Sequence, residues 1–497
     1  MRASGILMPV FSLPSRYGIG SFSKSAYQFV DMLKKAGQKY WQILPLCPTS
    51  YGDSPYQSFS TYAGNPYFID LDQLIEEKLL TRKECQTCDF GDDPQDIDYG
   101  KLYENRMPLL KLAYERSLEK PDPKFTAFWT ENAWWLDDYA LFMAVKDRFD
   151  GVAWNEWAED IRLRWSNAMD YYRRELYYEI EFYSYLQFVF MKQWKKLKNY
   201  ANINGIEIIG DIPIYVAFDS ADAWANPELF QFDAENLPTA VAGCPPDGFS
   251  ADGQLWGNPL YRWDYHRETG FDWWIRRIAY CSELYDVVRI DHFRGFDEYY
   301  SIPYGDTTAR NGHWEKGPGI ALFEAAKNRL GELNIIAEDL GYITDSVKKL
   351  VADSGFPGMK VLEFAFDSRE KSDYLPYTYE KNSVVYTGTH DNETIAGWYA
   401  GLDKSDLKMC TDYMNIDRIP GKEYHWDFIR LAMLSVSDLC VIPIQDYLGL
   451  DNRARINHPS TLGTNWRWRL AKGQLSASLL KEIREMTRIS GRLQNGE

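Results

Sequence analysis

Acidic side chains follow several apolar runs of this sequence, at the point where each run ends. VVRID ends in Asp291, IIAED places Glu338 directly after its apolar residues, VVYTGTHD ends in Asp391, and GIEIIGD ends in Asp211. An unpaired carboxylate is costly to bury, so each of these acids needs an explanation. A single one could cap the following helix or pair with an arginine. Several of them at equivalent places favour a shared chemical role.

Carboxyl groups used in pairs are what cleavage of a glycosidic bond requires. One carboxylate attacks as the nucleophile, while a second carboxyl stays protonated and gives its proton to the leaving oxygen. A third carboxylate could hold sugar hydroxyls. Arg289 lies two positions before Asp291 and so on the same face of a strand, where its cation would keep Asp291 ionised. No phosphate-binding loop, dinucleotide fingerprint or nucleophile elbow competes with this interpretation.

The elements that must position these acids alternate between short apolar runs and amphipathic helical stretches, which is typical of parallel β/α units. In the first helical stretch, Ala26, Phe29, Val30 and Leu33 fall on one face, and Gly37 suits its C-terminal cap. Eight runs are candidate strands, as a TIM (β/α)8 barrel requires. They are residues 5–13, 39–46, 205–216, 286–293, 334–340, 359–364, 383–391 and 439–448. The active site of such a barrel lies at the C-terminal ends of its strands.

Two long stretches interrupt this alternation, so we expect a single catalytic barrel over residues 1–497 with helical insertions. Residues 47–175 are rich in Tyr, Trp and charge, and they predict a helical insertion subdomain. Residues 213–285 predict a second insertion. It includes a Gly- and Pro-rich tract at 241–261 that we interpret as a long surface loop, with a substrate loop near 245–261.

Composition restricts the function classes. The net charge of -17 would repel phosphate backbones and anionic membranes, so neither nucleic acid nor a membrane is an expected partner. Aromatic residues make up 16% of the chain and could either stack on sugar rings or simply fill a large core. The first residues lack a signal-peptide pattern and no apolar run reaches transmembrane length, which predicts a cytoplasmic protein.

The seven cysteines are scattered and odd in number, which does not suggest a disulfide framework. Cys85 and Cys88 form one CxxC pair that could in principle bind zinc or act in redox chemistry. A zinc site would need a second ligand pair, and a redox motif would need a βαβ context; neither is visible. We therefore expect no metal and no cofactor.

Several long segments resemble one family. VVRIDHFRG, IIAEDLG and YTGTHDNET look like the catalytic segments of the α-amylase clan. Together with PTSYGDSPYQSFSTYAGNPYFID, FSADGQLWGNPLY and NHPSTLGTNWRWR, they make the chain similar to the 4-α-glucanotransferases called amylomaltases or disproportionating enzymes, which form glycoside hydrolase family 77. The matching segments run from residue 5 to about residue 470.

The resemblance implies a retaining, two-step transfer of a glucan segment to the 4-hydroxyl of another glucan or of glucose. Asp291 matches the family's nucleophile, Glu338 its general acid and base, and Asp391 its transition-state stabiliser. The substrate-binding residues that the resemblance implies are Tyr56, Asp211, Trp256, Asn258, Arg289, His292, His390 and Asn465. For His292 a packed core histidine is the alternative, and Trp256 could instead anchor its loop.

Two other functions share these residues. An α-glucan hydrolase would use the same first step, with water in place of the acceptor. A non-catalytic carbohydrate-binding protein would have no physical need to keep all three carboxylates. The expected partners are α-1,4-glucan donors with glucose or maltooligosaccharide acceptors, and a monomer and a homodimer both remain open.

Overall fold

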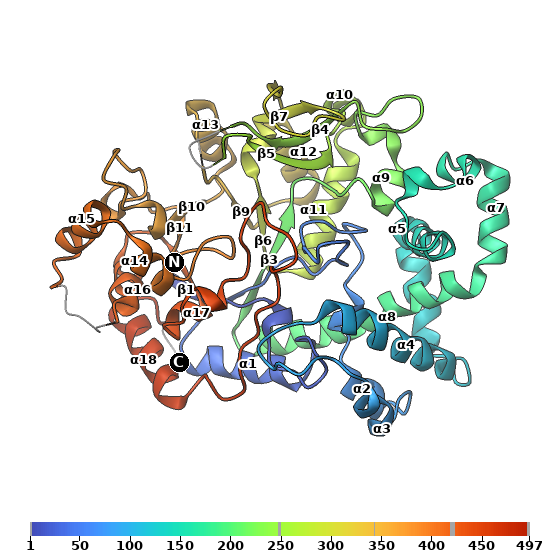
Figure 1. Cartoon of the computed structure of the whole chain (residues 1–497), viewed down its shortest axis with the longest axis horizontal. Coiled ribbons are helices and arrows are strands. Elements are labelled where there is room, and N and C mark those ends of the chain that lie inside the picture. The colour runs from blue at the N-terminus through green and yellow to red at the C-terminus, as the bar shows by residue number, and fades with distance from the viewer. Residues whose placement is uncertain (1, 247–249, 342, 418–422, 495–497) are drawn as a thin grey trace.

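Eight parallel strands close into a barrel in this computed structural model, which describes residues 2–246, 250–341, 343–417 and 423–494 (Figure 1). The order around the barrel is β1-β12-β11-β10-β9-β6-β3-β2. The strands are β1 (Ala3–Leu7), β2 (Tyr40–Gln42), β3 (Glu207–Pro213), β6 (Val287–Asp291), β9 (Ile335–Ala337), β10 (Gly358–Val361), β11 (Ser383–Tyr386) and β12 (Leu439–Pro443). Each overlaps one of the eight apolar runs, so the predicted TIM barrel is confirmed.

The register of three neighbouring strands brings the polar residues of the sequence together. β3 pairs with β6 so that Asp211 lies beside Arg289, and β6 pairs in turn with β9. A separate buried cluster of apolar side chains comes from the barrel strands themselves. Its members are Leu7, Ile209, Ile336, Met359, Val361, Val384, Tyr386 and Val441.

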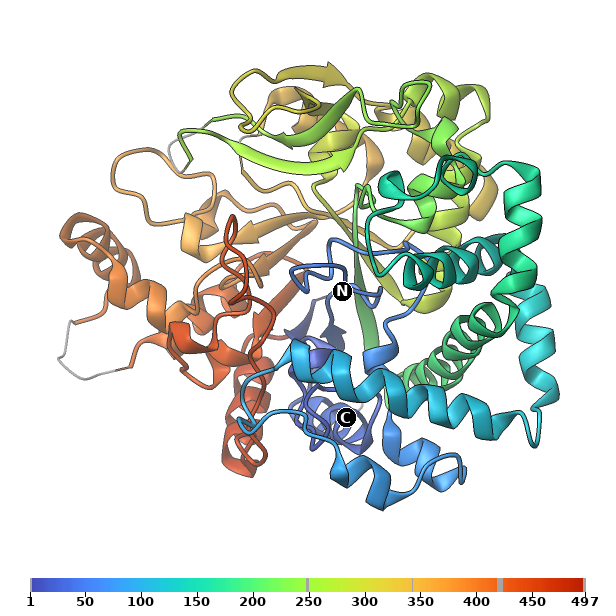
Figure 2. The same cartoon turned by 45° about the vertical axis from the view of Figure 1, so that its right-hand side comes forward.

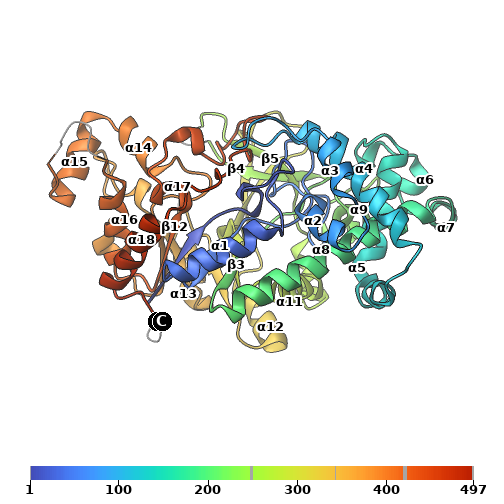
Figure 3. The same cartoon turned by 90° about the horizontal axis from the view of Figure 1, so that it is seen from below.

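Helices cover the outside of the barrel. The helix α1 (Lys24–Lys35) buries Ala26, Phe29, Val30 and Leu33, as its spacing predicts, and Gly37 follows it with a φ of 69°. Figure 3 shows α1 beside α8 (Tyr177–Ile203), with α11 (Asp272–Leu284) and α12 (Ile320–Leu330) further along the same side. The remaining helices after the later strands are α13 (Asp345–Ser354), α14 (Ile395–Gly401), α15 (Lys404–Met414), α16 (His425–Leu434), α17 (Ile444–Tyr447) and α18 (Ala477–Ile489).

A group of helices lies between β2 and β3 and forms one end of the molecule (Figure 2). They are α2 (Leu71–Glu76), α3 (Arg82–Thr87), α4 (Tyr99–Ser117), α5 (Pro123–Arg148), α6 (Glu159–Arg162) and α7 (Ser166–Glu175). The long helices α5 and α8 pack against each other, and α8 also contacts α1 and β3. Thus α8 connects the helical end of the molecule to the barrel wall.

A small antiparallel sheet lies beyond the C-terminal ends of β3 and β6, at the top of Figure 1. Its order is β5-β4-β7-β8, from β4 (Ala240–Cys244), β5 (Gln254–Pro259), β7 (Glu298–Pro303) and β8 (His313–Lys316). The prediction of a surface loop over 241–261 is therefore wrong for residues 241–244 and 254–259, which lie in β4 and β5, and β4 pairs with both β5 and β7. Within it, residues 247–249 lie outside the described residues. The remaining helices near this sheet are α9 (Ala221–Ala225) and α10 (Trp263–Glu268).

No helix in the described ranges is both long enough and apolar enough to cross a membrane.

Candidate active site

The four acids that the sequence singles out lie at the C-terminal side of the barrel. Asp211 is near the end of β3, Asp291 is the last residue of β6, Glu338 directly follows β9, and Asp391 lies in the connection after β11. Because β3, β6 and β9 are neighbours in the closed sheet, the first three acids share one part of the rim. The fold therefore brings together residues that are far apart in the chain.

A buried guanidinium connects two of these acids. Arg289 donates from Nη1 to Asp211 Oδ2 at 2.6 Å and from Nη2 to Asp291 Oδ1 at 3.0 Å. Arg289 and Asp211 are both fully buried, so each needs the other's charge. Burial lowers the pKa of Arg289, but the carboxylates of Asp211 and Asp291 outweigh it and raise the pKa well above its usual value. The guanidinium is therefore always charged.

Tyr56 adds a hydroxyl and an aromatic face to this group. Its hydroxyl donates to Asp211 Oδ2 at 2.7 Å. Its ring stacks on the His390 ring, with centroids 5.1 Å apart and planes only 9° from parallel. Burial lowers the pKa of His390, so the imidazole is neutral. Tyr56, Asp211, Arg289 and His390 thus form one continuous polar floor.

Glu338 is held by the backbone on either side of it. The His292 N–H donates to Glu338 Oε2 at 2.7 Å, and the Leu340 N–H donates to Oε1 at 2.8 Å. His292 has a φ of 54°, in the left-handed region that most side chains avoid. The residue in this conformation directly follows Asp291, and its N–H is the one that donates to Glu338. The position of the Glu338 carboxyl is consequently fixed relative to Asp291.

The surroundings of Asp291 and Glu338 change the pKa values of both carboxyl groups. Burial raises the pKa of both Asp291 and Glu338, and the repulsion between them raises the pKa of Asp291 further. The pair therefore retains a proton to higher pH than two exposed acids would. Arg289 donates directly to Asp291, and this contact favours the negative charge on the Asp291 carboxylate.

Asp391 has hydrogen-bond partners different from those of Asp291 and Glu338. Asn457 Nδ2 donates to Asp391 Oδ1 at 2.6 Å, and Arg455 Nη2 donates to the backbone oxygen of Asp391 at 2.8 Å. The side chain of Asp391 is 42% exposed, unlike the buried Asp211. This carboxylate is therefore oriented by the protein while still open to a ligand.

Sequence reasoning missed Asn457 and Arg455 as parts of the site. Both come from the segment after β12 and reach back across the barrel rim to Asp391. Asn457 opens the tract NHPSTLGTNW, whose resemblance to the family was the signal available. Neither residue follows an apolar run, so the pattern that reveals the carboxylates does not reveal them.

Asp446, another residue not singled out from the sequence, joins the two ends of the loop that carries His390 and Asp391. This aspartate is fully buried in α17. It accepts from the Thr387 hydroxyl, just after β11, and from the Ile395 N–H at 2.8 Å, at the start of α14. The loop 388–394 between these two anchors therefore has both of its ends fixed to one carboxyl.

The two residues expected from the second insertion lie on β5. Trp256 is half-buried, and its ring meets the His292 ring edge to face with centroids 4.8 Å apart. The His292 imidazole is neutral, since burial lowers its pKa to about 3. Asn258 accepts from Gln57 Nε2 at 3.1 Å and donates to the Val216 oxygen at 2.8 Å. Trp256 is therefore part of a strand and not of a flexible loop.

Asn465 is engaged within its own loop. Its Oδ1 accepts from the His458 N–H at 2.9 Å, and its Nδ2 donates to the Thr461 oxygen at 2.9 Å. These contacts close the turn between His458 and Asn465. Contact of Asn465 with a sugar stays a prediction, and the observed bonds give this residue a role in shaping the loop.

The CxxC pair lies away from these groups. Cys85 is buried in α3 and Cys88 ends that helix; both are free thiols. Burial raises the pKa of Cys85 to about 11 and also raises the pKa of Cys88, so neither is a thiolate at neutral pH. Among the described residues, no group of three or more His, Cys, Asp or Glu is arranged to hold a metal ion.

Comparisons with known proteins agree on one family. The model of the 4-alpha-glucanotransferase family matches residues 8–475. A 4-alpha-glucanotransferase of Clostridium butyricum is 49% identical, over 98% of this chain and 100% of its own. One of Streptococcus pneumoniae is 50% identical, over 99% of this chain and 98% of its own. The amylomaltase of Streptococcus agalactiae, solved in complex with acarbose, is 44% identical with a TM-score of 0.97, covering 99% of this chain and 100% of its own.

The buried Asp446 makes stability depend on pH in a defined direction. Burial raises its pKa to about 7, whereas the unfolded chain releases this proton near pH 3.9. The stability that the protonated form contributes is full below about pH 4 and is lost as the pH rises to about 7. Asp446→Asn keeps the shape without a titrating proton, so it removes this loss.

We compare the melting temperature of Asp446→Asn with that of the parent at each pH. The variant's melting temperature minus the parent's should be a few degrees higher at pH 8 than at pH 5. Thermal unfolding monitored by circular dichroism measures this difference. Asp264→Asn is the control, because the Asp264 side chain is 93% exposed. The melting temperature of this variant minus that of the parent should be the same at pH 5 and pH 8. A constant difference for Asp446→Asn as well would contradict the assignment.

Proposed function

Because the chain belongs to the 4-alpha-glucanotransferase family, we propose that its rim carboxylates carry out the transfer in two steps. The chain is a glycosyltransferase that cleaves α-1,4-glucans and passes the glucan segment to another glucan. Of the observations on the site, the Arg289 guanidinium held between Asp211 and Asp291 carries the proposal, because it keeps one carboxylate charged beside a carboxyl that retains its proton.

In the first step Asp291 attacks the anomeric carbon of the donor sugar. Its charge is maintained by Arg289, at 3.0 Å. Glu338 gives its proton to the glycosidic oxygen as the bond breaks, which lets the leaving chain depart as a neutral alcohol. The product is a covalent glycosyl-enzyme ester at Asp291 and a free sugar chain.

In the second step Glu338, now ionised, takes the proton of the acceptor's 4-hydroxyl. Its two backbone N–H contacts, from His292 and Leu340, stabilise this ionised form and hold it in place for the proton transfer. The acceptor oxygen then displaces Asp291. Two inversions at one carbon give net retention of the α configuration.

The other rim residues hold the sugar in this proposal. Asp391, open to a ligand and oriented by Asn457, stabilises the positive charge that develops on the sugar ring. Tyr56 stacked on His390 offers an apolar face beside polar edges, which suits a glucose ring. His292, Asn258 and Asn465 remain proposed sugar contacts.

In our proposal the two insertions contribute substrate-binding residues to the rim of the barrel. We assign residues 1–497 to one catalytic barrel, 47–175 to a helical insertion subdomain that contributes Tyr56, and 213–285 to an insertion that contributes Trp256 and Asn258. A role in maltodextrin, starch or glycogen metabolism and a cytoplasmic location stay predictions from the family and the N-terminal sequence.

Incubation with maltotriose tests the function itself. Transfer yields longer maltodextrins together with glucose, whereas hydrolysis yields only shorter sugars and pure binding yields no change. Chromatography of the products separates the three outcomes. A product set of shorter sugars alone would replace the transferase by the hydrolase alternative.

Asp291→Ala should lose essentially all transfer from maltotriose, because no glycosyl-enzyme ester can form. We expect less than about a hundredth of the parent activity, as is typical when a group that acts in the transition state is removed. Asp345→Ala is the matched control, since Asp345 is an exposed acid at the start of α13. If Asp291→Ala kept more activity than this, the nucleophile would have to be another residue.

Glu338→Gln should lose far more activity with maltotriose than with an α-glucosyl fluoride donor. Fluoride departs without a proton, so the first step no longer needs the acid. Azide should restore turnover on the fluoride, because it attacks the intermediate without needing a base. Initial rates on both donors, with and without azide, make the comparison. Equal losses on the two donors and no rescue would point to a different acid.

Trp256→Ala should raise the ratio of hydrolysis to transfer and raise the acceptor KM more than it slows donor cleavage. The half-buried indole on β5 can cover the acceptor ring and keep water from the glycosyl-enzyme ester. Free glucose released per cleavage event and the acceptor KM report this directly. A loss of melting temperature with an unchanged transfer ratio would instead make Trp256 an anchor for β5 and His292.

A further inference from the structure

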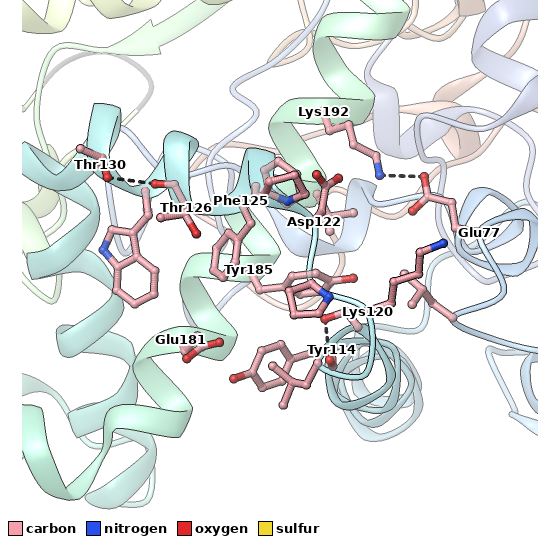
Figure 4. A pocket seen from close by; sticks show the side chains of 18 of the residues that line it. Glu77, Tyr114, Lys120, Asp122, Phe125, Thr126, Thr130, Glu181, Tyr185 and Lys192 are labelled. Atoms are coloured by element: carbon pink, nitrogen blue, oxygen red, sulfur yellow. Dashed lines mark hydrogen bonds and ion pairs between the residues drawn. The ribbon is translucent and has the colours of Figure 1, made fainter.

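A hollow lies on the helical end of the molecule, where the end of α4, the start of α5 and one face of α8 meet (Figure 4). Its volume is about 830 Å³, within the range of ligand-binding pockets. Its described lining residues belong to α4, α5, α8, the segment between α4 and α5, and the turn after α2, and they include none of the rim carboxylates. We refer to this hollow, lined along α8 by residues 177–192, as the α8 groove.

The groove follows one face of α8. The residues that α8 contributes include Tyr177, Glu181, Tyr185, Phe188 and Lys192, which repeat every three or four positions. Fifteen positions along a helix correspond to roughly 22 Å. The hollow is therefore an elongated groove that can hold a chain of several linked units, and not only one small molecule.

Aromatic rings line this groove from both sides. On α5, Phe125 and Trp129 are only half-buried, and their ring centroids lie 5.7 Å apart. The Trp129 Nε1 donates to Asp137 at 2.7 Å, which holds the indole in place. On α8, Tyr177 is 62% exposed. Fixed aromatic surface open to solvent suits the apolar faces of sugar rings.

The polar groups of the groove are nearly balanced in charge. Glu77, Asp122 and Glu181 face Lys120 and Lys192, and Lys192 already pairs with Glu77 at 2.8 Å. Figure 4 shows these groups around the aromatic rings, with the hydroxyls of Thr126 and Thr130 alongside. Donors and acceptors without a strong net charge match a neutral ligand rich in hydroxyl groups. A phosphorylated ligand or a strongly charged peptide would find no complementary field.

From these features we infer that the α8 groove binds a segment of an α-glucan chain, as a second carbohydrate site separate from the barrel rim. The inference rests on the glucan substrate of the transferase and adds a site to it. The bound segment would tether a long donor or acceptor to the enzyme and raise its effective concentration at the rim. Short sugars that fill only the rim would gain nothing from it.

Native electrophoresis in gels with and without amylopectin tests binding on the full chain. The background is Asp291→Asn, so that the polymer is not consumed. Trp129→Ala and Tyr177→Ala should each reduce the retardation by amylopectin, with the double variant close to unretarded. Tyr171→Ala is the control, because Tyr171 is half exposed on α7 and is not part of the groove.

Kinetics in the otherwise unchanged enzyme complete the test. The KM for amylose should rise roughly three- to tenfold in each groove variant, which corresponds to the loss of one stacked ring. The kcat/KM for maltotriose should stay within about twofold. Because Tyr177 is mostly exposed, its removal should leave the melting temperature unchanged.

Two results would overturn the inference. One is unchanged retardation and unchanged amylose KM in both variants; the other is an equal loss on amylose and maltotriose, which would trace the effect to the rim. Failure of the transferase function would look different. The unmodified enzyme would then not disproportionate maltotriose, while the retardation by amylopectin could still be measured.

Discussion

The Arg289 guanidinium is the interaction on which the site depends. It is buried between Asp211 and Asp291 and is the cation shared by both. Without it, three buried or half-buried acids on neighbouring strands would repel one another and take up protons. With it, the carboxylate of Asp291 has a cation at 3.0 Å at the end of its strand. The barrel provides the necessary proximity, because β3, β6 and β9 are adjacent in the closed sheet.

The second requirement is a fixed geometry for the loops above this floor. Asp391 belongs to no strand, so its position depends on side chains from elsewhere: Asn457 at its carboxylate and Asp446 at both ends of its loop. Both partners come from the segment that follows the last strand, β12. The final part of the chain therefore both completes the barrel and orients a residue in the connection after β11.

Much of this could be predicted from the sequence because apolar strands and the acids that end them lie next to each other in the chain. All eight barrel strands and the acids at their ends were found in this way. The antiparallel sheet was not, since β4 and β5 are short strands in a Gly- and Pro-rich tract and β4 pairs with β7 from a different connection. Asn457 and Asp446 were missed for a related reason: their partners are distant in sequence, and no local periodicity marks such contacts.

His292 shows how one position can be constrained twice. Its backbone is left-handed and its N–H donates to Glu338, while its ring packs against Trp256. A β-branched replacement would be disfavoured by the backbone alone, whatever the ring contacts. Invariance of this histidine among relatives would therefore not by itself identify it as a sugar ligand. Asparagine and glycine tolerate this conformation, so natural sequences that carry either one would separate the selection acting on the main chain from the selection acting on the imidazole.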